Sequence, residues 1–203
     1  LAQSNTTKYE DISYHILTHS SGVQVLASST RPEYAEMITP EIVSQILEEV
    51  KLHYDFVIID NTSFFDDISL AGMDAADIIM LIAGMDIPAI KNTKLCLEVL
   101  YSLEHSQKIK LILNKFNKKM GIPRKDIESS LGMKASYIIP EEEQITPSLN
   151  KGIPFIEAHP RSTAAQEIKR IAKDLLGTPL VNTVPEEVKT KDSSLPRVLG
   201  LGT

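Results

Sequence analysis

The sequence predicts an α/β fold with one doubly wound, mainly parallel sheet and helices on both of its faces. Short runs that are almost unbroken Val, Ile and Leu alternate along the chain with segments of helical periodicity. Unbroken apolar runs are typical of parallel strands covered on both faces, and their alternation with helices implies right-handed crossovers. The 203 residues are also enough for one domain with its own core.

Five of the apolar runs are expected to be the strands of this sheet. Most of them hardly alternate with polar residues, which favours strands that are buried on both sides. The expected strands are residues 23–27, 56–59, 78–83, 109–113 and 136–139.

Six segments between and after these runs are expected to be helices. The first begins with the capping residue Thr39, followed by Pro and Glu, a combination typical of a helix N-terminus. Asp66 and Asp67 are expected to cap the second helix, and the last ends at Gly177, a residue type that favours helix C-termini. The expected helices are residues 39–53, 68–74, 88–103, 124–131, 146–151 and 162–177.

Residues 1–177 are expected to form this domain, and residues 178–203 are expected to form a flexible tail. The tail contains three prolines and scattered charges but no helical stripe. The sequence begins with Leu1 and not with Met, which suggests a part of a longer chain.

Composition and charge exclude several classes of protein. With 42% hydrophobic and 24% charged residues, the chain fits neither a disordered nor a membrane-embedded protein. Its net charge of −6 comes without a basic cluster, so nucleic acid is not an expected partner. The one cysteine, Cys96, cannot form an internal disulfide, which indicates a reducing, cytoplasmic compartment.

Asp60 is the first candidate functional residue, because it directly follows the apolar run 56–59. Ligands of doubly wound sheets bind at the carboxyl ends of the strands. A carboxylate at this place is how P-loop nucleoside triphosphatases hold Mg²⁺ or its water beside the phosphates. The alternative is that Asp60 is a turn or capping residue without a ligand.

Asn114 follows the run 109–113, and Pro140 and Glu141 follow the run 136–139. A side-chain amide at the end of one strand and a proline-containing turn at the end of the next can present donors and acceptors to the edge of a purine. The alternative is that Asn114 caps a loop.

Six motifs follow one another along the chain: residues 22–33, 54–60, 86–93, 111–115, 139–142 and 150–154. In this order they resemble the MinD/ParA group of deviant-P-loop ATPases, and most closely its CpaE/TadZ branch of pilus-assembly localisation factors. The resemblance extends from the first of these motifs to Gly177, so it leaves out both ends of the chain.

The resemblance implies ATP and Mg²⁺ as cofactors. It implies that Asp60 is the catalytic and metal-site residue, near Mg²⁺ and the attacking water. It further implies that Asn114 contacts adenine, and that Pro140 and Glu141 line the base pocket through their backbone. Residues 86–93 are implied to lie at the face used for dimerisation or partner binding.

As a function, the resemblance implies an ATP-hydrolysing homodimer that positions pilus or secretion machinery. Such a protein is expected in the cytoplasm, with recruitment to the cell pole or to the inner membrane face through partners. Two alternatives are a pseudo-ATPase scaffold without catalysis and a partition or division-site ATPase of the ParA or MinD type. The ParA type needs a basic DNA-binding surface, which the net charge of −6 does not favour.

Two departures from the family pattern affect this expectation. Thr62 stands where the family commonly has proline, which bears on the rigidity of the loop after Asp60. In addition, neither a Gly-x-x-x-x-Gly-Lys-Ser/Thr run nor a Lys-Gly-Gly run occurs in the sequence. Either the phosphate loop precedes Leu1 in a longer protein, or the protein is a true pseudo-ATPase.

Overall fold

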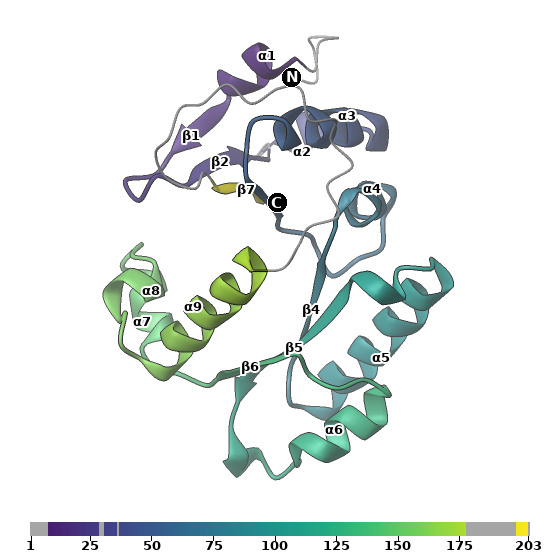
Figure 1. The fold of residues 1–203 in the computed structure, drawn as a ribbon, viewed down its shortest axis with the longest axis vertical. Helices are drawn as coiled ribbons and strands as arrows, with labels where there is room; N and C mark the ends of the chain where they lie inside the picture. Colours follow the sequence, from purple (N-terminus) through teal and green to yellow (C-terminus); the bar gives the residue numbers. More distant parts are fainter. Residues whose placement is uncertain (1–7, 29–30, 36, 178–197, 203) are drawn as a thin grey trace. The chain divides into compact units, whose positions relative to one another are not determined.

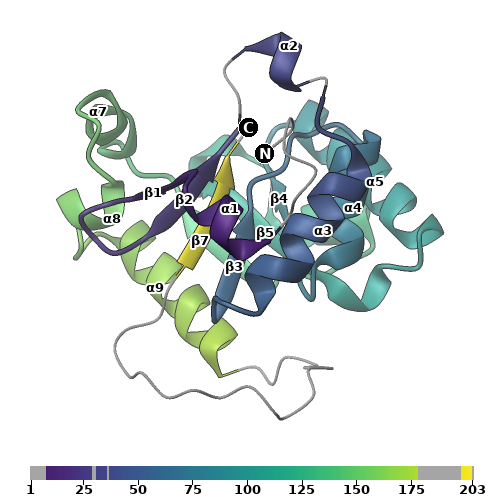
Figure 2. The ribbon, with the colours of Figure 1, turned by 90° about the horizontal axis from the view of Figure 1, so that it is seen from above.

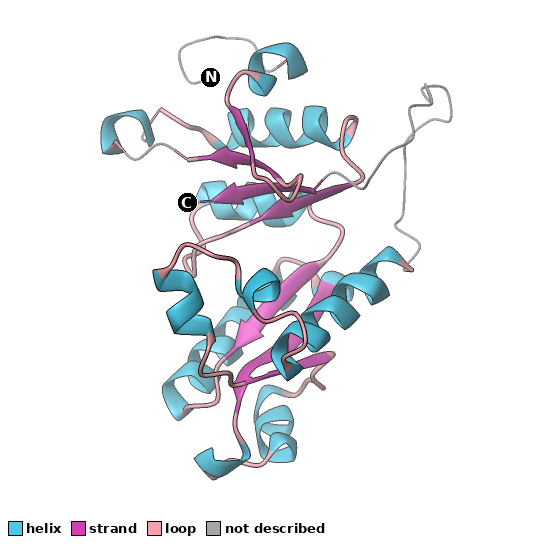
Figure 3. Cartoon of the chain, turned by 90° about the vertical axis from the view of Figure 1, so that its left-hand side faces the viewer, coloured by secondary structure: helices cyan, strands magenta, loops and turns pink. Residues whose placement is uncertain are grey.

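The computed structural model contains two compact units. The first consists of Leu1–Ala76 together with Thr183–Thr203, and the second consists of Asp77–Asn182. Helices accompany the strands in both units, which confirms the α/β class (Figure 3). The structure describes residues 8–28, 31–35, 37–177 and 198–202.

The first unit contains a four-stranded sheet with the order β1-β2-β7-β3. β1 (Ile16–Thr18) is antiparallel to β2 (Gln24–Ala27). β7 (Val198–Gly202) pairs in parallel with β2 on one side and with β3 (Phe56–Ile59) on the other, as Figure 2 shows. Three of the four strands are therefore parallel.

β7 differs from the flexible tail that the sequence analysis expected over residues 178–203. Val198–Gly202 forms a parallel strand, in which Leu199 is aligned with Gln24 of β2 and with Val57 of β3. The run is short and contains two glycines, which weaken any strand signal in the sequence. Residues 178–197 lie outside the described part of the chain, so the rest of the expected tail stays a prediction.

The core of the first unit lies between its sheet and two helices, α1 (Tyr9–Ser13) and α3 (Pro40–Lys51) (Figure 1). α3 repeats apolar residues at helical spacing and turns them toward β2 and β3. Val57 and Ile59 of β3 pack against the same cluster. The buried members of this core are Ile12, Leu26, Ile46, Leu47, Val50 and Tyr54.

The second unit contains a three-stranded parallel sheet with the order β4-β5-β6. The strands are β4 (Ile79–Ala83), β5 (Ile109–Phe116) and β6 (Tyr137–Pro140). α5 (Ile87–Ser102) packs on β4 and on α6 (Arg124–Leu131). Each strand is followed by a helix, which is the βαβ pattern that the sequence predicted.

β5 is the central strand of this sheet and is buried on both faces. On one face Ile112 packs against Ile171 of α9 (Thr163–Leu176). Its neighbours Leu111 and Leu113 point to the opposite face, because side chains alternate along a strand, and both are fully buried. This double burial explains why the run shows no polar alternation.

The sequence analysis expected one sheet, whereas the described strands form two. All five expected runs are strands, so the strand predictions are confirmed. β3 is an end strand of the first sheet and β4 is an end strand of the second. Apolar runs reveal that a segment is a strand, but they do not specify which edges of the strands pair.

All six expected helices are present, and several short elements add to them. Elements as short as α1, α2 (Pro32–Ala35) and β1 show no period that a sequence could reveal. No helix in the described ranges is long and apolar enough to cross a bilayer. The remaining elements are α2 (Pro32–Ala35), α7 (Ile145–Asn150), α8 (Phe155–Ala158) and the 3₁₀ turns Ser106–Lys108 and Lys118–Met120.

Capping side chains begin two of the helices, as the sequence predicted. Thr39 Oγ1 accepts a hydrogen bond from the N–H of Ile42 at 3.4 Å. At the start of α4 (Asp67–Ala75), Asp66 Oδ1 accepts a hydrogen bond from the N–H of Ser69 at 2.7 Å. This bond stabilises the carboxylate and so holds the pKa of Asp66 below its ordinary value of 3.8.

Leu111→Ala is expected to lower the free energy of unfolding by about 2–5 kcal/mol, because the truncated side chain leaves a cavity in the core. Leu111 is 0% exposed, whereas Leu149 in the same unit is 65% exposed. Leu149→Ala is therefore the matched control, with an expected change below about 0.5 kcal/mol. Urea denaturation followed by circular dichroism measures both, and equal losses would contradict the burial of β5.

Asp66→Asn is expected to reduce the acid sensitivity of the fold. The pKa of Asp66 is lower in the folded state than in the unfolded state. Its carboxylate therefore stabilises the fold fully above about pH 4, and this contribution disappears as the pH falls through the folded-state pKa. Melting curves recorded on both proteins from neutral pH into this acid range test the expectation. Parallel pH profiles would show that the cap does not act through its charge.

Candidate functional site

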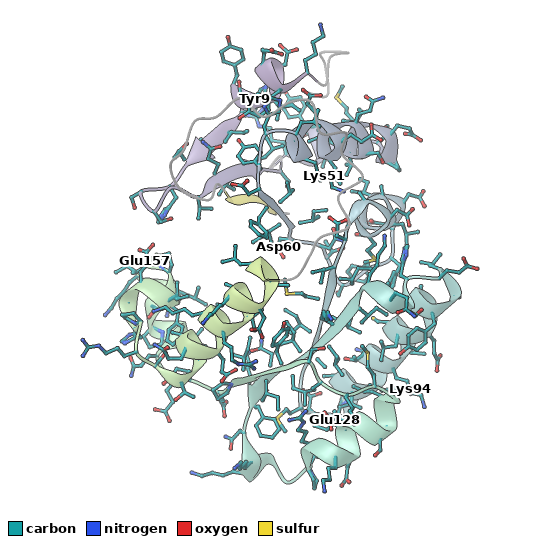
Figure 4. The ribbon with its side chains drawn as sticks, viewed as in Figure 1. Tyr9, Lys51, Asp60, Lys94, Glu128 and Glu157 are labelled. Carbon is teal, nitrogen blue, oxygen red and sulfur yellow. The ribbon has the colours of Figure 1, made fainter. Side chains whose placement is uncertain are left out.

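Asp60 directly follows β3 and is exposed on the first unit (Figure 4). No hydrogen bond or ion pair to another described residue engages its carboxylate. The group is therefore open to solvent, where a cation or an ordered water can take it as a ligand.

The loop after Asp60 is tied to α4 by its own side chains. Asn61 Nδ2 donates a hydrogen bond to the carbonyl oxygen of Ser69 at 3.4 Å, and Thr62 Oγ1 lies 3.4 Å from Ser69 Oγ. A Cβ added to Gly72 would lie 3.5 Å from the Asn61 amide, so this loop and α4 are in close contact. Thr62, which replaces the proline of the family pattern, is thus held by a hydrogen bond to a buried serine.

The second unit places the carboxyl ends of its strands at one edge, because β4, β5 and β6 run in parallel. Asn114 lies in β5 where the pairing with β6 shifts register between Leu113 and Phe116. Its Oδ1 accepts a hydrogen bond from the N–H of Lys115 at 2.9 Å, and Lys115 has a left-handed φ of 53°. Asn114 therefore stabilises an irregular backbone, and this bond leaves its Nδ2 donors unused.

Asn117 connects the loops that follow all three strands of this sheet. Its N–H points to Sδ of Met85, after β4, at 3.2 Å, and its Nδ2 donates to Oε2 of Glu141, after β6, at 2.6 Å. The N–H of Glu141 also donates to the carbonyl oxygen of Phe116 at 3.1 Å. Pro140, the last residue of β6, is aligned with Phe116.

Three of the four candidate residues thus come together. Asn114, Pro140 and Glu141 belong to one edge of the second unit, and Asp60 belongs to the first unit. The sequence analysis missed the connecting role of Asn117, although this residue stands in the same Asn-Lys-Phe-Asn run as Asn114. It also missed Met85, because an apolar side chain after a strand gives no functional signal.

Residues 86–93, the expected dimerisation or partner face, form the first turns of α5. Asp86 caps the helix, since its Oδ1 accepts a hydrogen bond from the N–H of Ala89 at 2.8 Å. A Cβ on Gly84 would lie 2.9 Å from the Cβ of Ala89, so the turn into α5 requires a glycine there. Ile87 is 73% exposed, so the start of α5 presents an apolar side chain to solvent.

The residues present suit part of a Mg²⁺–nucleotide site. Mg²⁺ at such sites needs one or two carboxylates beside phosphates and waters, and Asp60 is one exposed carboxylate. No group of three His, Cys, Asp or Glu side chains suited to a metal ion occurs among the described residues. A triphosphate also needs a glycine-rich loop, and the 203 residues contain none. The residues present therefore suit the binding of a base and of a metal-bound water. They do not include the loop that would bind the phosphates.

Comparison with known proteins finds sequence relatives that include a MinD protein and ATP-binding proteins. The chain is 26% identical over 155 residues to the septum site-determining protein MinD of Thermotoga maritima. The aligned region covers 72% of this chain and 57% of that protein. The chain is 23% identical over 180 residues to an uncharacterized ATP-binding protein of Methanocaldococcus jannaschii, with 88% and 67% covered. The chain thus spans little more than half the length of this MinD. No family model matches the sequence.

Solved structures agree with this relationship at the level of the fold. The ParA family ATPase of Chlorobium tepidum superposes with a TM-score of 0.74 at 20% identity, over 84% of this chain and 77% of that one. MinD of Pyrococcus horikoshii, solved as a complex with Mg-ADP, gives a TM-score of 0.70 at 20% identity, over 85% and 74%. The CpaE/TadZ branch stays a prediction. In sequence and in fold, this chain is therefore similar to the MinD/ParA ATPases.

Proposed function

We propose that this chain belongs to an ATP-binding protein of the MinD/ParA type, in which the nucleotide state controls dimerisation and partner binding. The observation that carries the proposal is the polar edge of the second unit, where Asn117 connects the loops after three parallel strands. Ligands of doubly wound sheets bind at this end of the strands. The relationship to MinD and to an ATP-binding protein supports the choice of ATP.

Asn114 is proposed to recognise the adenine base. Its Oδ1 is engaged by the N–H of Lys115, so the amide faces a ligand with its Nδ2 donors. A ring nitrogen of adenine is an acceptor that matches such a donor. Pro140 is held by its pairing with Phe116, and Glu141 is held by the hydrogen bond from Asn117. The backbone of these two residues is therefore proposed to form one side of the base pocket.

Asp60 is proposed to hold Mg²⁺ through a water molecule and to orient the water that attacks the phosphate. When bound, Mg²⁺ supplies charge neutralisation for the phosphates. The chain's own contribution is a carboxylate that no described residue engages, on a loop that Ser69 holds from the side. Such a loop keeps Asp60 in place without enclosing it.

The finer role follows the resemblance to the CpaE/TadZ branch. We infer a cytoplasmic homodimer that positions pilus or secretion machinery, with recruitment to the cell pole or inner membrane face through partners. The exposed Ile87 at the start of α5 supports residues 86–93 as the contact face, because an isolated apolar side chain there gains by being covered. A division-site or partition role is the alternative within the same family.

A non-catalytic scaffold is the second candidate function, and one observation favours it. The 203 residues contain no glycine-rich phosphate loop. Calorimetric titration of the intact gene product with ATP and Mg²⁺ separates the two candidates. Saturable binding of ATP supports the nucleotide proposal, and absence of binding supports the scaffold.

Asp60→Ala is expected to lower the rate of ATP hydrolysis by the intact gene product about 100-fold or more, because the attacking water loses its orienting carboxylate. Asp55→Ala is the matched control, since Asp55 is an exposed carboxylate before the same strand. Phosphate release under saturating ATP measures both variants, and circular dichroism checks their fold. Equal turnover in the two variants would refute the role of Asp60.

Asn114→Ala is expected to weaken ATP binding about three- to tenfold, which is the value of one hydrogen bond to the base. Asn150→Ala, at an exposed position on α7, is the control and should leave the affinity unchanged. Titration calorimetry gives both affinities, together with those for GTP as a base control. An Asn114 variant that binds ATP as tightly as the unchanged protein would exclude a base contact.

A further inference from the structure

The side-chain amide of Asn117 is engaged at both of its ends, which fixes its orientation. Its Oδ1 accepts a hydrogen bond from the N–H of Lys119 at 2.9 Å. The amide nitrogen therefore points the other way, where Nδ2 donates a hydrogen bond to Oε2 of Glu141 at 2.6 Å. Asn117 is thus held by its own loop, and it holds the carboxylate of Glu141 in turn.

Glu141 is fixed at two points, and one of its carboxylate oxygens remains available. The N–H of Glu141 donates a hydrogen bond to the carbonyl oxygen of Phe116 at 3.1 Å, which ties its backbone to β5. Asn117 binds only Oε2, and no described residue donates a hydrogen bond to Oε1. Because Glu141 is exposed, Oε1 is a positioned acceptor that a ligand can reach.

Glu128 in the same unit shows what a carboxylate with a purely structural role looks like. Its Oε1 accepts hydrogen bonds from the N–H of Ala135 and from Nε of Arg124, both at 2.8 Å, and its side chain is only 16% exposed. The bond from Ala135, with a smaller contribution from Arg124, holds the pKa of Glu128 below its ordinary value of 4.5. No described cationic side chain pairs with Glu141 in this way, so ion pairing within the fold does not account for its charge.

Together with Asn114, Glu141 gives the strand-end edge one donor and one acceptor. Oδ1 of Asn114 is engaged by the N–H of Lys115, so its Nδ2 is the group that a ligand meets. Adenine presents the acceptor N7 beside the donor amine on C6, whereas guanine presents two acceptors, N7 and O6. The pair of protein groups therefore complements adenine. With guanine, a carboxylate oxygen would face the carbonyl oxygen O6.

We propose that the carboxylate of Glu141, positioned by Asn117, accepts a hydrogen bond from the exocyclic amine of adenine and so rejects purines with an oxygen at C6. This inference rests on the proposed binding of ATP and adds the group that selects the base. Glu141 is then a specificity-determining residue through its side chain as well as through its backbone. Asn117 is a positioning residue, because it acts through Glu141.

The test compares three nucleoside triphosphates that differ at C6 of the purine. ATP carries an amine there, inosine triphosphate carries an oxygen, and purine riboside triphosphate carries a hydrogen. Titration calorimetry of the intact gene product with Mg²⁺ is expected to give the tightest binding for ATP, at least about tenfold tighter than for inosine triphosphate. Purine riboside triphosphate is expected to fall between them, because it loses the hydrogen bond without gaining the repulsion. Equal affinities for ATP and inosine triphosphate would overturn the proposal.

Glu141→Gln provides the sharpest variant, because the new amide has a defined orientation. Its oxygen accepts the hydrogen bond from Asn117, so its Nε2 donor turns to the ligand in place of Oε1. The variant is therefore expected to bind inosine triphosphate at least as tightly as ATP. Glu143→Gln, at an exposed carboxylate two positions later, is the matched control and should keep the preference for ATP.

Asn117→Ala separates positioning from a merely structural role. A loss of positioning lowers the ratio of the ATP affinity to the inosine triphosphate affinity. A structural role would weaken both nucleotides equally and leave this ratio unchanged, which would contradict the role given to Asn117. Circular dichroism checks that the variant is folded.

The outcomes distinguish this inference from the nucleotide proposal on which it rests. Binding of ATP with the same preference in Glu141→Gln as in the unchanged protein would overturn the role of the carboxylate alone. Absence of ATP binding to the unchanged protein would overturn both proposals. A preference for ATP that Glu141→Gln abolishes or reverses, and that Glu143→Gln retains, supports both.

Discussion

The parallel pairing of β5 with β4 and β6 is the constraint on which the candidate base site depends. Parallel strands end at the same edge, so the loops that carry Met85, Asn117 and Glu141 must meet there. The pairing is stable because β5 is covered on both faces, by Ile171 of α9 on one side and by the packing around Leu111 on the other. A buried strand of this kind cannot slip in register without exposing its apolar residues, so the edge keeps its geometry.

α4 has the corresponding role in the first unit, where it supports the loop after Asp60. The helix holds this loop through hydrogen bonds of Asn61 and Thr62 to Ser69. A Cβ added to Gly72 would lie 3.5 Å from the Asn61 amide, so the helix and the loop are in close contact. The position of this loop therefore depends on the position of α4.

The loop after Asp60 also shows how a departure from a family pattern can be compensated. Proline restricts a loop through its ring, and the sequence alone suggested that Thr62 loosens this segment. In the fold, Thr62 and Asn61 make hydrogen bonds to Ser69 instead, each with a net value of about 0.5–1.5 kcal/mol. Side-chain bonds can thus restrain the loop where the ring is missing, so Thr62 by itself is no evidence against catalysis.

The sequence by itself determined the local elements and their class. Continuous apolar runs specify buried strands, and capping residues such as Thr39 and Asp66 specify helix starts, because both signals arise within a few residues. Asp60 was predictable as a strand-end residue for the same reason, whereas β5 continues past Asn114 to Phe116. Only the tertiary structure decided that Val198–Gly202 inserts between β2 and β3, and that Asn117 reaches Glu141 across 24 positions. These contacts depend on which strand edges pair, and that choice is made by the packing of the whole unit and leaves no trace in the neighbouring residues.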